Sequence, residues 1–178
     1  MQNKIFHQIK TLPIFRLIIN LIMILILMSF SRVLFYLFNT QLFSDSNTSL
    51  LKAFLLGIRF DISAIIYVNG LYILMILIPF AFRNNTVYQK IAKVLFVTTN
   101  AVALLANFAD IIYYRFTLKR TTADIFSYFG VGGDFDKLLP QFLRDFWYIA
   151  LIWVLFVAVI FLLYQKPNLS FQKGNTCY

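Results

Sequence analysis

Long apolar runs without a charged side chain limit what this chain can fold into. Residues 62–82 and 146–165 contain no Asp, Glu, Lys or Arg and are dominated by aliphatic and aromatic residues. A helix rises 1.5 Å per residue, so about 20 apolar residues cross the ~30 Å hydrocarbon core of a bilayer. These runs therefore predict helices that span a membrane.

The composition of the whole chain agrees with a membrane protein. Of its 178 residues, 61% are hydrophobic and 19% are aromatic, and the mean hydropathy is +0.78, well above that of a soluble domain. The net charge of +9 would suggest nucleic acid as the partner of a soluble protein. Here the cations flank apolar runs, where they orient helices and meet anionic headgroups. We expect membrane lipids as partners and no nucleic acid.

We predict an all-α, polytopic membrane helical bundle with four transmembrane helices. The expected spans cover residues 15–38, 50–82, 93–113 and 146–165. They form a transmembrane domain over residues 15–165, between a cytoplasmic N-terminus (1–14) and a cytoplasmic tail (166–178). The apolar run after Arg16 is too long for a signal peptide and no small-x-small cleavage site follows it, so we expect the first span to be retained.

The segment between the third and fourth spans contains a further predicted helix. In "DFDKLLPQFLRDFW" the apolar residues Leu138, Leu139, Phe142 and Phe146 recur every three to four positions. This spacing predicts an amphipathic helix in the headgroup plane. The preceding "GVGGD" is a flexible break and not a phosphate loop, because no Gly-Lys-Ser/Thr ends it.

Basic residues predict the orientation of the spans. With both termini on one side, that side holds eight cations and no acid: Lys4, Lys10, Arg16, Arg83, Lys90, Lys93, Lys166 and Lys173. The opposite loops mix Asp with Lys and Arg. Because cytoplasmic loops carry the excess of Lys and Arg, we expect a multi-pass protein whose N-terminus is cytoplasmic.

Charges of both signs approach the outer ends of the spans. Arg32 and Asp110 lie about 25 Å along their helices from the cytoplasmic side, and Arg59 and Asp61 lie where the second span begins. A charge at mid-bilayer costs at least ~2.5 kcal/mol, which pairing reduces. We therefore hypothesise an interhelical polar cluster of Arg32, Arg59, Asp61, Asn107 and Asp110. The alternatives are interfacial anchors or direct contacts to a substrate.

Three phrases of the sequence resemble a known family. They are "GIRFDISAIIYVNGLYILMILIPF", "NFADIIYYRFTLKRTT" and "FLRDFWYIAL". Their order and spacing resemble the N-terminal membrane domain of lipoteichoic-acid-synthase-like phosphoglycerol transferases of the Bacteroidetes type, over roughly residues 15–165. The resemblance implies the bacterial cytoplasmic (inner) membrane. In this alkaline phosphatase/sulfatase superfamily, several spans precede an extracytoplasmic catalytic domain with a threonine nucleophile and a divalent metal, usually manganese.

The chain departs from that pattern after the fourth expected span. It ends at Tyr178 without the motif that carries the nucleophile, so we expect a truncated chain that is inactive alone. We assign no catalytic residue, metal ligand or cofactor to it. Manganese or another divalent metal would belong to the missing or separate catalytic domain. Cys177 and His7 are single residues of their type and supply no ligand set.

The resemblance implies a domain that anchors the catalytic domain and presents lipid headgroups to it. Arg115, Lys119 and Arg120 follow the third span, where a cation near an anionic surface gains about 1 kcal/mol and Arg can form a fork with phosphate. They are candidate contacts for anionic phospholipid headgroups, or else ordinary interfacial anchors.

A second interpretation is a freestanding four-helix membrane protein, such as a small transporter or an assembly subunit. A transporter is expected to place ionisable or unwound segments near the bilayer midplane. In the third span Asn100 is the best polar candidate at that depth. The charges instead gather toward one face, which favours the anchoring domain.

Overall fold

A computed structural model describes residues 13–42, 50–78, 85–117 and 144–167. The elements are α2 (Pro13–Phe38), η1 (Thr40–Leu42), α3 (Leu50–Val68), α4 (Gly70–Leu77), α5 (Thr86–Thr117) and α8 (Trp147–Leu163). Within these residues the chain forms helices and no strand. The predicted all-helical class is therefore confirmed for the part that is described.

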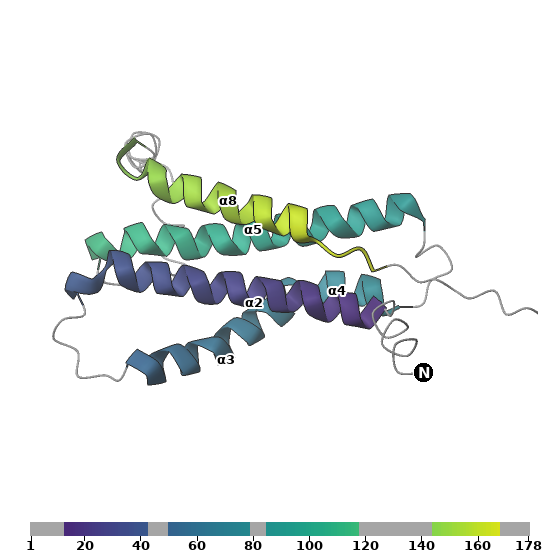
Figure 1. Ribbon diagram of the computed structural model, residues 1–178, viewed down its shortest axis with the longest axis horizontal. Coiled ribbons are helices and arrows are strands. Elements are labelled where there is room, and N and C mark those ends of the chain that lie inside the picture. The colour runs from purple at the N-terminus through teal and green to yellow at the C-terminus, as the bar shows by residue number, and fades with distance from the viewer. Residues whose placement is uncertain (1–12, 43–49, 79–84, 118–143, 168–178) are drawn as a thin grey trace, which may run out of the picture.

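The long helices form a bundle. Helices α2, α5 and α8 run lengthwise side by side, with α5 in contact with both α2 and α8 (Figure 1). Helix α4 packs against α2 and α5. Helix α3 is tilted relative to the bundle, so that its N-terminal end lies away from the other helices and its C-terminal end joins α4 (Figure 1). The start of α2 and the end of α8 lie at the same end of the bundle.

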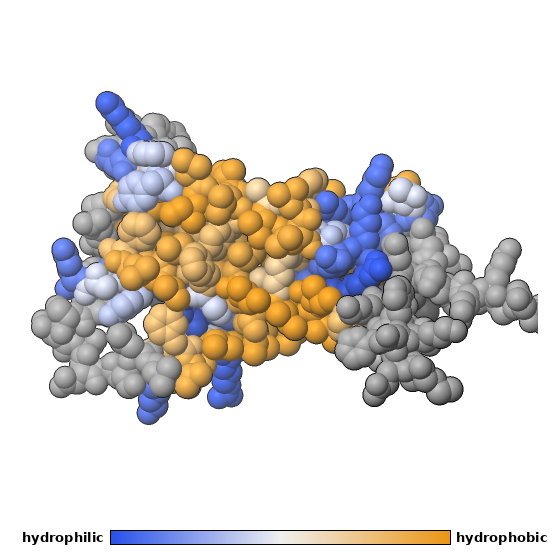
Figure 2. Space-filling view, in the orientation of Figure 1, coloured by the Kyte–Doolittle hydropathy of each residue, from blue (hydrophilic) through white to orange (hydrophobic). Residues whose placement is uncertain are grey.

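The core is apolar and aromatic along its length. Tyr72 of α4 lies 4.7 Å, ring centroid to centroid, from Phe96 of α5. Further along the bundle, Phe108 of α5 meets Phe156 of α8 edge to face at 5.2 Å, a geometry that aromatic rings favour. Around this core, Figure 2 shows a hydrophobic belt between two hydrophilic ends. Such a belt is the surface expected of helices surrounded by lipid.

Two helices are long and apolar enough to cross a membrane, namely Pro13–Phe38 and Thr86–Tyr114. The pair Lys52–Val68 and Gly70–Leu77 makes a third if the two parts are counted as one bent span. Trp147–Leu163 is apolar but has 17 residues, or about 25 Å, which is shorter than a ~30 Å core. Length and composition thus support two or three of the four predicted spans.

The predicted continuous span over residues 50–82 is divided at Asn69, where α3 and α4 meet at a bend of 62°. Asn69 and Gly70 both have low helix propensity. The Asn69 side chain also donates from Nδ2 to the carbonyl of Ile65, 3.0 Å away, and such local bonds compete with regular helix. The backbone bonds Asn69 N to Ile65 O and Ile73 N to Asn69 O still bridge the bend.

The third predicted helix is longer than its expected span, because α5 begins at Thr86 instead of Lys93. The side chain of Asn85 accepts a hydrogen bond from the N–H of Val87 at 3.0 Å, as an N-cap does. Polar residues in the first turns can continue a helix into the headgroup region. The predicted amphipathic helix at Leu138, Leu139 and Phe142 lies outside the described residues.

Candidate functional site

An ion pair joins α2 to α3. Arg32 donates from Nη2 to Oδ1 of Asp61 at 2.6 Å and to the carbonyl of Gly57 at 3.0 Å. Its Nη1 donates more weakly to the carbonyl of Phe54 at 3.5 Å. The side chains of Arg32 and Asp61 are 22% and 12% exposed. Charge-assisted bonds in such a poorly solvated place are stronger than neutral ones, so this contact holds the leaning helix α3 to the bundle.

Gly57 makes room for the guanidinium. A Cβ atom at this position would lie 1.4 Å from Nη1 of Arg32 and 2.2 Å from Cζ. The guanidinium therefore lies directly against the backbone of α3, which is how it reaches two main-chain carbonyls. From the sequence alone, we predicted no role for Gly57. A glycine four residues before an acid on the same helix face was the available signal.

The other residues of the predicted cluster are placed differently. Arg59 is exposed on α3, Asn107 is half-buried on α5, and Asp110 is 7% exposed on α5. Within the described part of the chain, no hydrogen bond joins Asn107 to Arg32, Asp61 or Asp110. The structure thus brings Arg32 and Asp61 into contact and leaves Arg59 and Asn107 outside that contact.

The predicted headgroup residues lie at the limit of what the structure describes. Arg115 belongs to the last turn of α5, but its side chain is outside the described atoms, as are Lys119 and Arg120. Their role in phosphate contact stays a prediction.

A reciprocal amide pair lies at the bend. Asn69 donates from Nδ2 to Oδ1 of Asn100 at 3.0 Å, and Asn100 donates back from Nδ2 to Oδ1 of Asn69 at 2.7 Å. Both residues are buried, and Asn100 also donates to the carbonyl of Phe96. A polar side chain buried in apolar surroundings requires such partners. The pair therefore fixes the bend of α3–α4 against α5.

A third polar contact closes the end of the bundle where α2 begins. Asn20 accepts from the N–H of Gln165 at 2.9 Å and donates to the Gln165 carbonyl at 3.0 Å. It also donates to the hydroxyl of Tyr72 at 2.9 Å. Residues 164–167 follow α8 in non-helical backbone, so the main-chain groups of Gln165 have no helical partners of their own. The fully buried amide of Asn20 pairs with both of them.

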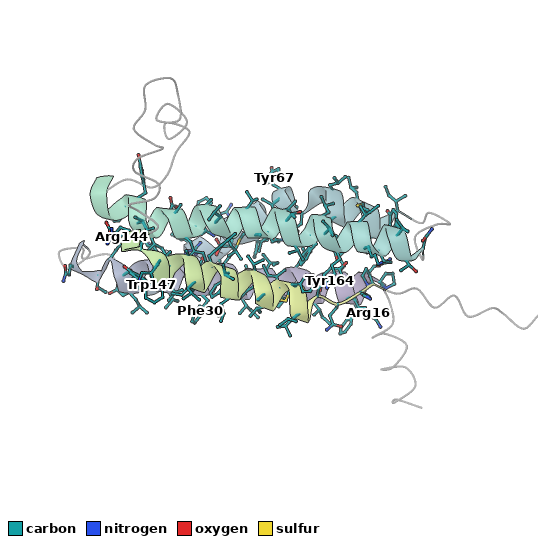
Figure 3. All side chains as sticks on the ribbon, turned by 90° about the horizontal axis from the view of Figure 1, so that it is seen from above. Arg16, Phe30, Tyr67, Arg144, Trp147 and Tyr164 are labelled. Atoms are coloured by element: carbon teal, nitrogen blue, oxygen red, sulfur yellow. The ribbon has the colours of Figure 1, made fainter. Side chains whose placement is uncertain are left out.

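Two basic side chains make further contacts at the end of the bundle where α2 begins. Arg16 donates to the carbonyl of Lys166, and the Lys93 ammonium lies 3.6 Å from the ring centroid of Phe161, a cation–π contact. Figure 3 shows Arg16 and Tyr164 toward one end of the bundle and Arg144 and Trp147 toward the other. Asn20 was not among the predicted site residues, although an Asn inside an apolar run is a signal for an interhelical hydrogen bond.

The chemistry of these contacts is structural. They join α2 to α3, α4 to α5, and α2 to the segment after α8. Among the described residues, no group of three or more His, Cys, Asp or Glu side chains is arranged to hold a metal ion.

No protein-family model matches this chain, and neither a curated protein nor a solved structure is significantly similar to it. The likeness to phosphoglycerol transferases therefore rests on the three sequence phrases, and the function has to be argued from the geometry.

Proposed function

We propose that this chain is the membrane-anchoring domain of a phosphoglycerol- or phosphoethanolamine-type transferase of the sulfatase superfamily, and that it does not catalyse by itself. The observation that supports an anchor best is the combination of an apolar outer belt with polar contacts between the helices. Buried polar bonds hold neighbouring helices in one arrangement. The link to a transferase comes from the sequence resemblance.

The proposed anchor has four spans and a cytoplasmic N-terminus in the bacterial inner membrane. Helix α8 lies along α5 and so shares its depth. Trp147, the first residue of α8, is exposed, and tryptophan favours the membrane–water interface. Local thinning of the bilayer accommodates a helix of about 25 Å.

The proposed role at the outer surface is to hold the catalytic domain close to its lipid substrate. Arg115, Lys119 and Arg120 are the candidate contacts to anionic headgroups. Replacing all three by Gln should weaken the binding of phosphatidylglycerol vesicles while the helical content stays unchanged. Unchanged vesicle binding would exclude the headgroup role.

The link to a transferase can be tested in the genome and in the cell. We expect the coding sequence after Tyr178, or a neighbouring gene, to encode an extracytoplasmic sulfatase-like domain that copurifies with this chain from membranes. The absence of such a domain from both places, together with no copurifying transferase activity, would contradict the proposal.

The bend at Asn69 favours a second candidate, a small transporter, because transporters form midplane sites from interrupted helices. In this chain the two amides at the bend bind each other. In a Cys177→Ser background, Ala103→Cys, one turn from Asn100, distinguishes the two functions. An anchor should protect it from membrane-impermeant thiol reagents on both sides, whereas a transport pathway should expose it.

A further inference from the structure

A groove of about 360 Å³ opens between α2 and α3, where the two helices diverge. Its walls are Leu25, Phe30 and Val33 of α2 and Phe54 and Ile58 of α3. Phe30 is 52% exposed and Ile58 is 36% exposed, so the groove opens on the outer surface of the bundle. In a bilayer this surface faces lipid, and its apolar walls suit an acyl chain.

Arg32 is the charged residue in the wall of this groove. A guanidinium has five N–H donors. Nη2 uses two of them on Asp61 and Gly57, and Nη1 uses one on Phe54. The remaining two have no partner among the described residues. An unpaired donor at membrane depth is costly, so this end of the groove favours an occupant that carries an acceptor.

The charge of Arg32 decides which acceptor fits. Asp61 at 2.6 Å already pairs with the guanidinium, so a second anion would lie close to the Asp61 carboxylate in a poorly solvated place and be repelled by it. A neutral acceptor adds hydrogen bonds without that penalty. Arg32 lies six residues, or about 9 Å, before the end of a helix about 39 Å long, near the edge of a ~30 Å core. Ester carbonyls of glycerolipids occupy that boundary.

We infer that the groove between α2 and α3 binds one acyl chain of a glycerolipid, whose ester carbonyl accepts a hydrogen bond from Arg32. The groove recognises the ester linkage of the lipid and should bind lipids with neutral and anionic headgroups equally well. This inference requires that the chain lies in a membrane, but it does not depend on the proposed transferase.

A second groove supplies a matched control. It measures about 400 Å³, lies between α5 and α8, and is lined by Val97, Trp153, Ala158 and other apolar residues without any charged one. Lipid that merely coats the protein should treat both grooves alike. A specific site should respond only to changes between α2 and α3.

The test measures retention of dioleoylphosphatidylcholine by the detergent-purified full chain, using native mass spectrometry. Ser29 lines the first groove, and Ser29→Phe fills it while Arg32 and Asp61 are both kept. We expect Ser29→Phe to remove the tightly held lipid and Ala158→Phe to leave it in place. The diether analogue, which lacks both carbonyls, should bind about fivefold more weakly than the diester, as expected for the loss of one hydrogen bond.

Three results would overturn the inference. They are equal lipid loss from the two variants, equal retention of the diester and diether lipids, and, in a background with Arg115, Lys119 and Arg120 replaced by Gln, clear selection of dioleoylphosphatidylglycerol over the choline lipid. If Ser29→Phe does not fold, as judged by circular dichroism, Val33→Phe fills the same groove from the next helical turn and must give the same loss.

Discussion

The guanidinium of Arg32 lies against the main chain of Gly57, so that a methyl group on the glycine would sit 1.4 Å from Nη1. Helices α2 and α3 therefore meet where the long side chain of Arg32 lies on the bare backbone of Gly57. The contact explains why α3, which leans away from the other helices, is still held to α2.

Gly57→Ala should destabilise the protein by about 2 kcal/mol. Alanine favours a helix by about 1 kcal/mol over glycine, but the displaced guanidinium loses charge-assisted bonds to two carbonyls, each worth more than a neutral bond. The change is measured as the free energy of unfolding in detergent micelles. Gly70→Ala is the control, because nothing lies within 4 Å of its Cβ position. It should leave stability unchanged or raise it, and equal effects at both sites would contradict the contact.

Arg32 and Asp61 should show strong coupling in a double-mutant cycle. Arg32→Gln and Asp61→Asn each remove one partner of a poorly solvated ion pair, which costs about 3 kcal/mol. The double variant should lose at least about 1 kcal/mol less unfolding free energy than the two single variants lose in sum, because neither charge is then left without its partner. Arg59→Gln, a change to an exposed residue on the same helix, should show no coupling to Arg32→Gln. Strict additivity for Arg32 and Asp61 would contradict an energetic pair.

The Asn69–Asn100 pair should stabilise the bend. Asn100→Leu leaves the Asn69 amide without its partner, so we expect a loss of about 1–3 kcal/mol. The double variant with Asn69→Leu should be less damaged than the sum by about 0.6–1.7 kcal/mol, the range for hydrogen bonds within membranes. Asn107→Leu, a half-buried residue of the same helix, is the matched control and should have little effect in the same unfolding assay.

The length of the apolar runs was sufficient to predict that these segments are helical, because long apolar segments have few other stable states in lipid. It did not predict the break at Asn69 or the start of α5 at Thr86. The opposite signs of Arg32 and Asp61 also raised the idea of a contact between spans. Helix formation depends on each segment alone, and the contact between Arg32 and Asp61 follows from their opposite charges.

Contacts made across the chain could not be predicted in the same way. In the sequence Asn69 is one polar residue in an apolar run, yet in the fold its side chain pairs with Asn100, 31 positions later. Asn20 meets Gln165 over a separation of 145 residues. The role of Gly57 appears only when the side chain of another helix is placed on it. In each case the position of the side chain is set by a tertiary contact, which local helix propensity is too weak to predict.

Asn20→Leu should release the segment after α8. The N–H of Gln165 donates to Asn20 Oδ1 and its carbonyl accepts from Asn20 Nδ2, so leucine leaves both groups unpaired. We expect faster hydrogen–deuterium exchange in peptides that cover residues 164–167, by about tenfold for the loss of roughly 1.4 kcal/mol. Thr98→Val, which removes bonds only within α5, should leave that exchange unchanged. Unaltered exchange in Asn20→Leu would show that the segment is held by other contacts.

Opposite ends of the bundle should label from opposite sides of the membrane. Thr40 in η1 and Thr86 at the start of α5 are exposed residues at different ends, and the excess of Lys and Arg predicts that the end with Thr86 is cytoplasmic. In a Cys177→Ser background, Thr40→Cys should react with a membrane-impermeant maleimide added to intact spheroplasts. Thr86→Cys should react only after the membrane is opened. Reaction of both before opening would contradict the spanning arrangement, and the reverse pattern would contradict the predicted orientation while leaving the spans in place.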